Sequence, residues 1–324
     1  MSAGFSLLGE SVALGTTVSW SIGIFPFTEA ARRLGPAQLN HIRLVFAVIL
    51  LTVLSLVFLP VTFSGLFFSP LPEHWLWFGL SGIIGLALGD YFGFTSFAVL
   101  GPRIGSIFST LAPTAALLAG FFIIGERINF IGIIGILVTI SGVIWLTLTR
   151  SAKSEMQDHE YGNVGKGIIY GVLSAVCQGV GVVLANKGFQ SQIDHHDLSP
   201  FHATWIRMIC ATTIIWLITL SQGRIKTITG PAFQNKNKGL AYALGGTIFG
   251  PVIGVSLSMY SVSLLHDKPS VAQTIFSLMP VVVLPLSWLF YKETITLKSV
   301  LGALVAIAGV MILIWREAIL NAFI

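Results

Sequence analysis

The stretch PRIGSIFSTLAPTAALLAGFFIIGERINFIGIIGILVTISG, residues 102–142, decides the fold because a second copy follows it. The second copy, PSVAQTIFSLMPVVVLPLSWLFYKETITLKSVLGALVAIAG, occupies residues 269–309. Prolines, a glutamate and glycines recur in both copies at one offset of 167 residues, without a gap. The pairs are Pro102 with Pro269, Pro113 with Pro280, Glu126 with Glu293, Gly135 with Gly302 and Gly142 with Gly309. A tandem duplication of this length predicts two repeated structural units.

The duplication continues upstream into the rest of each half. There the offset grows from 156 to 165 residues, as expected where loops gain residues. The upstream pairs are Gly15 with Gly171, Gly23 with Gly179, Arg43 with Arg207, Gly85 with Gly250 and Gly89 with Gly254. Glycines at every fourth residue predict close helix packing. The most polar segment is 150–165, so we expect repeats over 1–149 and 166–324 joined by that linker.

The composition is that of a membrane protein. Apolar residues make up 54% of the chain and charged residues 10%, whereas an ordinary soluble domain is about 25% charged. A spanning helix needs about 20 mostly apolar residues. Ten stretches meet this need, near 7–29, 40–60, 75–99, 104–124, 129–149, 166–187, 203–221, 238–264, 270–291 and 297–316. The first is expected to remain as a helix, because neither basic residues before it nor a cleavage site after it mark a signal peptide.

The number of spans predicts how the halves are arranged. Five spans in each half is an odd number, so the second half would enter the membrane from the opposite side. We therefore expect an all-α membrane protein of ten transmembrane helices, built as two inverted five-helix repeats around a central cavity. In such folds the substrate site lies near the middle of the membrane, between the repeats.

The order of these features resembles a known family. Five-helix halves, an arginine early in the second helix, a proline midway along the fourth and the motif Gly125-Glu126-Arg127 are similar to the EamA branch of the drug/metabolite transporter superfamily. Lys292-Glu293-Thr294 echoes the motif, although Tyr291-Lys292 replaces Ile124-Gly125 there. The resemblance covers nearly the whole chain. It implies ten helices around a central cavity and alternating-access movement of a small solute, without naming the solute.

Asp90 is the most informative single residue. It follows Gly85 and Gly89 about ten residues from the end of the expected helix 75–99. A carboxylate inside the hydrocarbon costs about 2.5–3.5 kcal/mol on insertion scales, so it should face protein or water. It could contact a substrate amine or carry a coupling proton, or it could be a structural carboxylate satisfied by a neighbour. The equivalent residue is Val255, so any such site is asymmetric.

Arg43 and Arg207 lie about one turn inside the expected helices 40–60 and 203–221. Each could bind an anionic substrate or pair with Asp90. Each could also snorkel, with its charged end at the membrane surface. We expect snorkelling or structural pairing, and in inverted repeats the two arginines would lie near opposite membrane faces.

Pro113 and Pro280 lie halfway along the expected fourth and ninth helices. Proline removes a backbone hydrogen bond and bends a helix. In a membrane the freed carbonyl must meet protein or a cavity. We expect bends here, with Ser109, Gln273 and Ser277 among the residues that reach the cavity.

Four more residues lie at mid-helix depth in helices that, by the resemblance, line the cavity. They are Trp20, Tyr91, Gln178 and Tyr260. Gln178 is the strongest candidate because a buried amide needs hydrogen-bond partners. The aromatic residues could equally serve packing alone.

Other classes of function have weaker support. The sequence has no phosphate-binding loop, and we interpret the run DHHD at 194–197 as a solvated loop and not a metal site. We expect no cofactor and no metal. The net charge of +5 arises from residues beside apolar helices, which orients a protein in the bilayer and does not indicate nucleic-acid binding. The expected partners are a small-molecule substrate and the lipid bilayer; the oligomeric state is not indicated.

The preferred hypothesis is a secondary transporter for a small metabolite, with a proton-coupled exporter as one form, in a bacterial inner or plasma membrane. An organic-anion carrier would need Arg43 or Arg207 to point into the cavity. A lipid flippase would need a groove open to the bilayer. An intramembrane enzyme would need two catalytic groups at one depth, and only Asp90 lies deep enough.

The orientation in the membrane is predicted differently by charge and by resemblance. Loops on one face carry 12 basic residues, and the face with both termini carries 4. Basic loops stay in the cytoplasm, so this bias places both termini outside. Proteins that the chain resembles usually keep both termini in the cytoplasm. We favour the charge count because the loops concerned are short.

Overall fold

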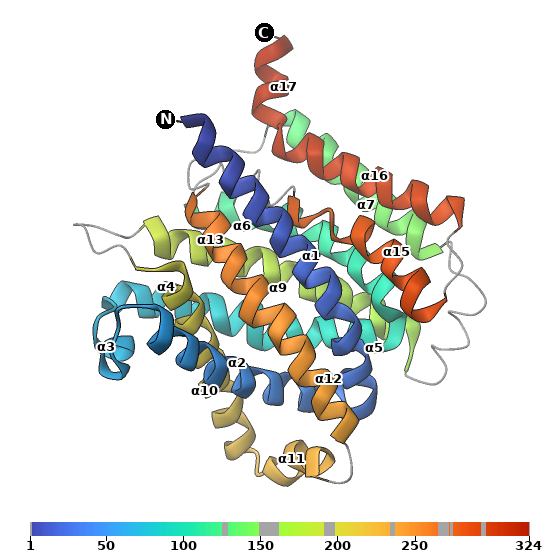
Figure 1. The fold of residues 1–324 in the computed structure, drawn as a ribbon. Helices are drawn as coiled ribbons and strands as arrows, with labels where there is room; N and C mark the ends of the chain where they lie inside the picture. The colour runs from blue at the N-terminus through green and yellow to red at the C-terminus, as the bar shows by residue number, and fades with distance from the viewer. Residues whose placement is uncertain are drawn as a thin grey trace.

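The computed structural model describes residues 2–124, 129–148, 162–190, 198–233, 237–264, 272, 275–292 and 296–323. Every regular element in these ranges is a helix (Figure 1). The expected all-α fold is therefore confirmed for the described part of the chain. Glu126, Gln273, Glu293 and the DHHD run at 194–197 lie outside it.

The first half begins with a long helix and contains one extended helical run that changes type along its length. In that run, α4 passes into a π-helix, η1, then into α5, a 3₁₀ turn, η2, and α6. The elements are α1 (Ser2–Leu34), α2 (Pro36–Phe58), α3 (Phe63–Phe68), α4 (Pro72–Ser81), η1 (Gly82–Gly89), α5 (Asp90–Ile107), η2 (Phe108–Leu111), α6 (Ala112–Ile124) and α7 (Phe130–Leu148).

The second half repeats this order, including the π-helix in its third span. Its elements are α9 (Val164–Gln190), α10 (Pro200–Ser221), α11 (Ile225–Phe233), α12 (Asn237–Thr247), η3 (Ile248–Val255), α13 (Ser256–Leu264), α15 (Met279–Tyr291), α16 (Leu297–Ile314) and α17 (Arg316–Phe323). The π-helices η1 and η3 fall at matching places, since Gly85 and Gly89 of η1 correspond to Gly250 and Gly254 of η3.

Among the described residues, five helical runs are long and apolar enough to cross a membrane: Pro36–Phe58, Pro72–Ile123, Val164–Gln190, Pro200–Ser221 and Lys238–Leu264. Three shorter apolar helices are Phe130–Trp145, Met279–Tyr291 and Leu297–Ile312. The expected count of ten spans is thus not confirmed. The expected spans 75–99 and 104–124 both lie in the run Pro72–Ile123, whose backbone breaks at Gly101 with φ of 76°. A positive φ is favourable for glycine, and Pro102 follows it directly.

The two halves are interleaved. Helix α1 packs along α12, η3 and α13 of the other half, and α9 packs along α4, η1 and α5 (Figure 1). The first helix of each half therefore lies against the third span of the other. Equivalent helices also pair, α2 with α10 and α7 with α16.

Where α7 and α16 cross, two contacts are equivalent in the duplication. A methyl group on Gly142 would overlap the backbone nitrogen of Ala306, and one on Gly309 would overlap that of Thr139. Thr139 and Gly142 correspond to Ala306 and Gly309 at the repeat offset of 167 residues. The same close approach thus occurs twice, because glycine at both positions lets the backbones touch.

The prolines sit differently from the prediction. Pro113 is the second residue of α6 and Pro280 the second residue of α15, so neither lies in the middle of a regular helix. The irregular backbone precedes them, as the 3₁₀ turn η2 before α6 and as Leu278, with ψ of −2°, before α15. Proline fits the first turn of a helix because an N–H there needs no intrahelical partner.

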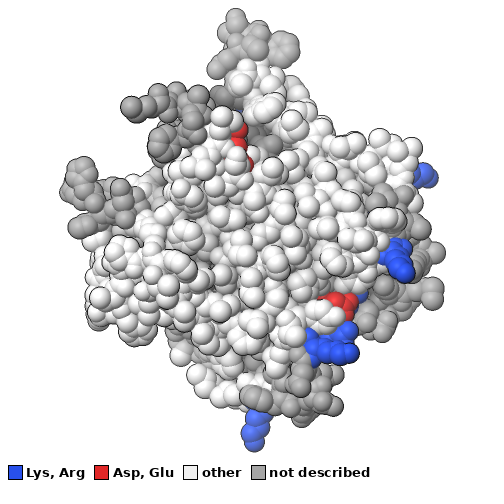
Figure 2. Space-filling model, viewed as in Figure 1, with Lys and Arg blue, Asp and Glu red and all other residues white. Residues whose placement is uncertain are grey.

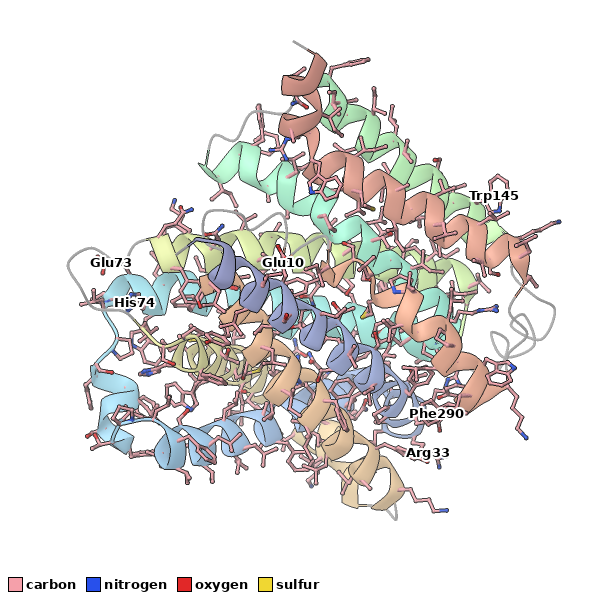
Figure 3. The ribbon with its side chains drawn as sticks, turned by 45° about the horizontal axis from the view of Figure 1, so that its top comes forward. Glu10, Arg33, Glu73, His74, Trp145 and Phe290 are labelled. Carbon is pink, nitrogen blue, oxygen red and sulfur yellow. The ribbon has the colours of Figure 1, made fainter. Side chains whose placement is uncertain are left out.

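The outer surface is apolar over a wide area. In the view of Figure 2 most of the face is uncharged; two acidic patches are visible, and the visible Lys and Arg lie along the right side and at the bottom. Leu14 and Val18 of α1 are among the exposed apolar residues. Trp145 and Phe290 point away from the bundle (Figure 3) and are also exposed. A surface of this kind suits contact with lipid.

Candidate functional site

A cavity of about 200 Å³ lies between the two halves. Its wall takes residues from α1, α2, η1, α5, η2 and α6 of the first half and from α9, η3 and α15 of the second. Six residues singled out in the sequence line it together: Trp20, Arg43, Asp90, Ser109, Gln178 and Ser277. They come from positions far apart in the chain, and the interleaving of α1 and α9 brings them to one space.

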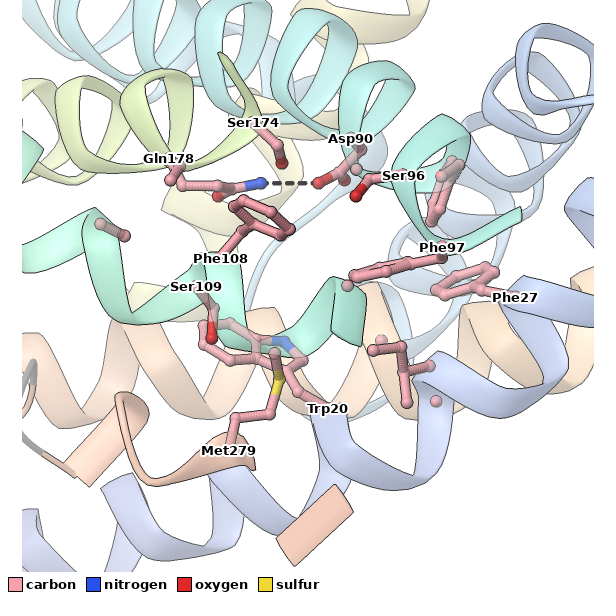
Figure 4. A pocket seen from close by; sticks show the side chains of 18 of the residues that line it. Trp20, Phe27, Asp90, Ser96, Phe97, Phe108, Ser109, Ser174, Gln178 and Met279 are labelled. Carbon is pink, nitrogen blue, oxygen red and sulfur yellow. Dashed lines mark hydrogen bonds between the residues drawn. The ribbon is translucent and has the colours of Figure 1, made fainter. Parts of the chain in front are cut away.

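Asp90 is the centre of the polar part of this wall. One carboxylate oxygen, Oδ2, lies 2.7 Å from Arg43 Nη2. The other, Oδ1, accepts a hydrogen bond of 2.7 Å from Gln178 Nε2 (Figure 4). The side chain of Asp90 is 21% exposed, whereas that of Arg43 is 1% exposed. The charged group with the greater access to solvent is therefore the carboxylate.

Arg43 is held by several acceptors besides Asp90. Its Nε and Nη2 donate to Asn40 Oδ1 at 3.1 and 2.9 Å, and Nη2 also donates to the carbonyl of Leu86. The guanidinium carbon lies 5.5 Å from the centre of the Phe94 ring. A buried arginine needs such a full set of partners to offset the loss of hydration.

The π-helix η1 explains why these groups gather here. A π-helix departs from the regular α-helical hydrogen-bond ladder, and such turns are frequent at functional sites. Four carbonyls in η1 accept side-chain hydrogen bonds from other helices. The donors are Gln178 to residue 85, Arg43 to residue 86, Asn40 to residue 87 and Ser174 to residue 89. Asp90 follows directly, so the same turn positions the carboxylate and its partners.

The rest of the wall is largely aromatic and apolar. Trp20, Phe27, Phe97, Phe108 and Met279 surround the space below the polar cluster in Figure 4. Trp20 contacts Phe276 with ring centres 5.2 Å apart. The cavity thus has one polar end and one apolar end, which is the usual composition of a small-molecule site.

Four serines also line the cavity: Ser96, Ser109, Ser174 and Ser277. Ser109 Oγ donates to the carbonyl of Ser106 at 2.5 Å, and Ser277 lies in the second half near the start of α15. Both were predicted to reach this space. Ser96, which the sequence did not single out, is 1% exposed, and among the described residues its hydroxyl has no hydrogen-bond partner. It is free to bond a group that enters the cavity.

The two arginines correct one prediction. Arg43 and Arg207 are both at most 3% exposed, so neither snorkels to the membrane surface. They do not lie near opposite faces either, because both reach the same turn of η1: Arg43 donates to the carbonyl of Leu86, and Nη2 of Arg207 lies beside Gly85. The alternative of structural pairing holds for Arg43. The cause is the packing of α2 against α10, which brings both arginines to η1.

The predicted tyrosines lie elsewhere. Neither Tyr91 nor Tyr260 is among the described residues that line the cavity. Tyr91 lines a separate pocket of about 380 Å³ with Arg32 and Lys166. Pro113 and Pro280 are also absent from the described cavity wall, although their neighbours Ala112 and Met279 belong to it.

The described residues contain no cluster of three His, Cys, Asp or Glu side chains that could hold a metal ion. The acidic and basic groups at the cavity are those of Asp90 and Arg43. The arrangement can bind a polar group at one end and enclose an apolar body at the other. The carboxylate of Asp90 can gain or lose a proton, or change its hydrogen-bond partner.

Comparison with known proteins agrees with the duplication. The model of the EamA-like transporter family matches residues 7–148 and again residues 165–315. No curated protein matches the chain. A solved structure, described only as a crystal structure of a protein, covers 95% of this chain and 98% of its own with a TM-score of 0.60. At 15% identity that likeness concerns the fold alone.

Proposed function

Because the chain belongs to the EamA-like transporter family, we propose that it is a secondary transporter that moves a small metabolite across the membrane by alternating access. The observation that carries this proposal is the cavity between the halves, with a partly exposed carboxylate, Asp90, in its wall. Ionisable groups inside a membrane protein commonly mark a substrate or proton path.

The proposed movement uses the two repeats, 1–149 and 166–324, as inverted units that rock about the cavity. The helices that line the cavity support this proposal because several are interrupted beside it. The interruptions are η1, η2, η3 and the break at Gly101. Such irregular turns can absorb a change of backbone angle while the flanking helices move as rigid bodies.

The substrate that fits this cavity has a polar group and a compact apolar body. Asp90, Ser96 and Gln178 form the polar end, where the carboxylate accepts hydrogen bonds and the serine hydroxyl can donate or accept. Trp20 and Phe27 belong to the apolar end. A metabolite bound in this way would exchange its hydration for contacts at both ends.

Asp90 is also the proposed coupling group. A proton on this carboxylate would remove its charge and weaken the contact with Arg43. Protonation and substrate binding would then compete for one group, which is how a proton gradient can drive export. The steps require only the carboxylate and a path to water from each side.

The experiment is a flux screen in proteoliposomes. Purified protein is reconstituted, and uptake and efflux of a panel of small metabolites are measured with and without a pH gradient. The proposal predicts saturable flux of at least one solute above that of empty liposomes, with a rate that changes when the gradient is imposed. Flux no greater than in empty liposomes for every solute, with protein of verified fold, would contradict it.

A further inference from the structure

One carboxylate, that of Asp90, lies in the same part of the fold as two buried arginines that are copies of each other. Arg43 on α2 and Arg207 on α10 are equivalent in the duplication, and they are 1% and 3% exposed. The position equivalent to Asp90 is Val255. The duplication has therefore kept both cations and only one anion.

The surroundings of the two arginines are equivalent as well. The guanidinium of Arg43 lies over the ring of Phe94, and Nη1 of Arg207 lies 3.4 Å from the sulfur of Met259. Phe94 and Met259 are separated by 165 residues, the same offset as Asp90 and Val255. Each arginine thus contacts the side chain one turn beyond the Asp90 or Val255 position.

Arg207 is poorly satisfied where it lies. Within the described part of the chain, its Nε has no hydrogen-bond partner, and the acceptor that Nη1 meets is a thioether, which accepts weakly. A buried guanidinium in such a state is unfavourable unless an anion is near. The charges of Asp90 and Arg43 both act on it.

Arg207 is also close to the Asp90 cluster. Its Nη2 would be 3.5 Å from a methyl group on Gly85. The carbonyl of Gly85 accepts a hydrogen bond from Gln178, which also donates to Asp90. One turn of η1 therefore separates the guanidinium from the carboxylate, and this turn is the irregular one.

We propose that Asp90 exchanges its ion pair from Arg43 to Arg207 when the protein passes between its two open states, so that Arg207 is a positioning residue for transport. Inverted repeats exchange their conformations in the two states. Arg43 would then have the surroundings that Arg207 has here, without an ion pair, and would release the carboxylate; Arg207, beside Gly85 of η1, is the buried cation that can then take it. This inference rests on the proposed function and adds the partner of Asp90 in the second state.

The test measures which face of the membrane the cavity opens to. The native cysteines, Cys177 and Cys210, are replaced by alanine, and Ser109→Cys supplies one reporter in the cavity wall. A membrane-impermeant thiol reagent is applied from either side of oriented vesicles, and the ratio of the two labelling rates is recorded. We expect Arg207→Met to shift this ratio at least threefold one way and Arg43→Met at least threefold the other way.

Two further variants keep the test decisive. Arg207→Lys retains the charge and should bring the ratio back toward that of the parent. If an arginine variant fails to fold, the double variant Asp90→Val with Val255→Asp moves the carboxylate to the equivalent position. Arg207 then has the partner that Arg43 has here, and the ratio should shift as it does for Arg43→Met.

The outcomes separate this inference from the proposed function. Shifts in the same direction for both arginine variants, or no shift, in a parent that is labelled from both sides would overturn the exchange and leave transport standing. If the parent and every variant are labelled from one side alone, both the exchange and the transport proposal are overturned. Opposite shifts in a protein that transports no solute would support the exchange and remove the transport proposal.

Discussion

The pairing of Arg43 and Asp90 predicts a large energetic coupling between the two side chains. The perturbation is Asp90→Asn, which keeps the shape of the side chain and removes its charge. The amide can still accept one hydrogen bond, from Arg43 or from Gln178, where the carboxylate accepts both at 2.7 Å. The guanidinium of Arg43 is then buried without its counterion.

The magnitude follows from burial. Breaking a buried ion pair by removing one partner costs roughly 3–5 kcal/mol, because the other charge is left uncompensated. Asp90 is 21% exposed and asparagine keeps one hydrogen bond, so we place the loss in unfolding free energy at the lower end, about 3 kcal/mol. In the double variant Asp90→Asn with Arg43→Gln, no charge is buried without a partner. The coupling energy between residues 43 and 90 should therefore be about 2–3 kcal/mol.

The assay is a double-mutant cycle on reversible unfolding in mixed micelles, with denaturing detergent as the variable. The matched control is the pair Glu29 and Arg33, which lie 3.2 Å apart on one helix with both side chains more than a quarter exposed. An exposed pair of this kind should couple by about 0.2–1 kcal/mol. A coupling between Arg43 and Asp90 no larger than that of the control would refute the reasoning.

Three other predictions follow from the packing, the cavity and the charges. Gly82→Ala should destabilise the protein by about 1–3 kcal/mol, because the added methyl meets the backbone of α10. Gly230→Ala is the control, because a methyl group there meets nothing within 4 Å. Equal stability of the two variants would contradict the close packing of Gly82 on α10. Ser109→Cys and Ser277→Cys, without native cysteines, should react with water-soluble thiol reagents, and protection in all conditions would exclude them from an aqueous cavity. A cytoplasm-specific reporter after Ile324 should stay inactive, since the loop charges place the termini outside; strong activity would reverse the orientation.

Some features of the site could be predicted from the sequence because they depend on chemistry at fixed positions. An aspartate deep in an apolar helix must find partners. Arg43 was one of the two partners considered for it, whereas Gln178 was predicted only to line the cavity. The structure joins these three residues. Ser109 and Ser277 were also predicted, since they precede prolines that were expected to bend their helices, and both line the cavity.

Other features depend on how the halves interleave, which a single sequence does not specify. Tyr91 adjoins Asp90 in the chain, yet successive residues of a helix point about 100° apart, so Tyr91 faces a different pocket. For Arg207 we expected snorkelling or structural pairing, and its burial excludes snorkelling because α10 packs on α2 and η1. The sequence allowed the depth of a residue along its helix to be estimated. It did not show which residue of another helix that residue would contact.

The π-helices were the part of the fold that was hardest to predict from the sequence. Glycines at every fourth residue predicted close packing, and they do allow it, but the extra residue per turn leaves no distinct pattern in the composition. Ser96 and Ser174 consequently were not predicted, because their roles depend on the geometry of η1 and α5.

The central claim is that the carboxylate of Asp90 couples transport to a proton gradient. The most direct test compares the flux driven by a pH gradient in the parent protein and in Asp90→Asn, in the same proteoliposome preparation. The account predicts that the parent carries its solute at a rate set by the gradient. It also predicts that Asp90→Asn, although folded and reconstituted to the same density, loses at least 90% of that flux and its dependence on pH. Equal flux and equal pH dependence in the two proteins would contradict the account, because the cavity carboxylate would then have no part in transport.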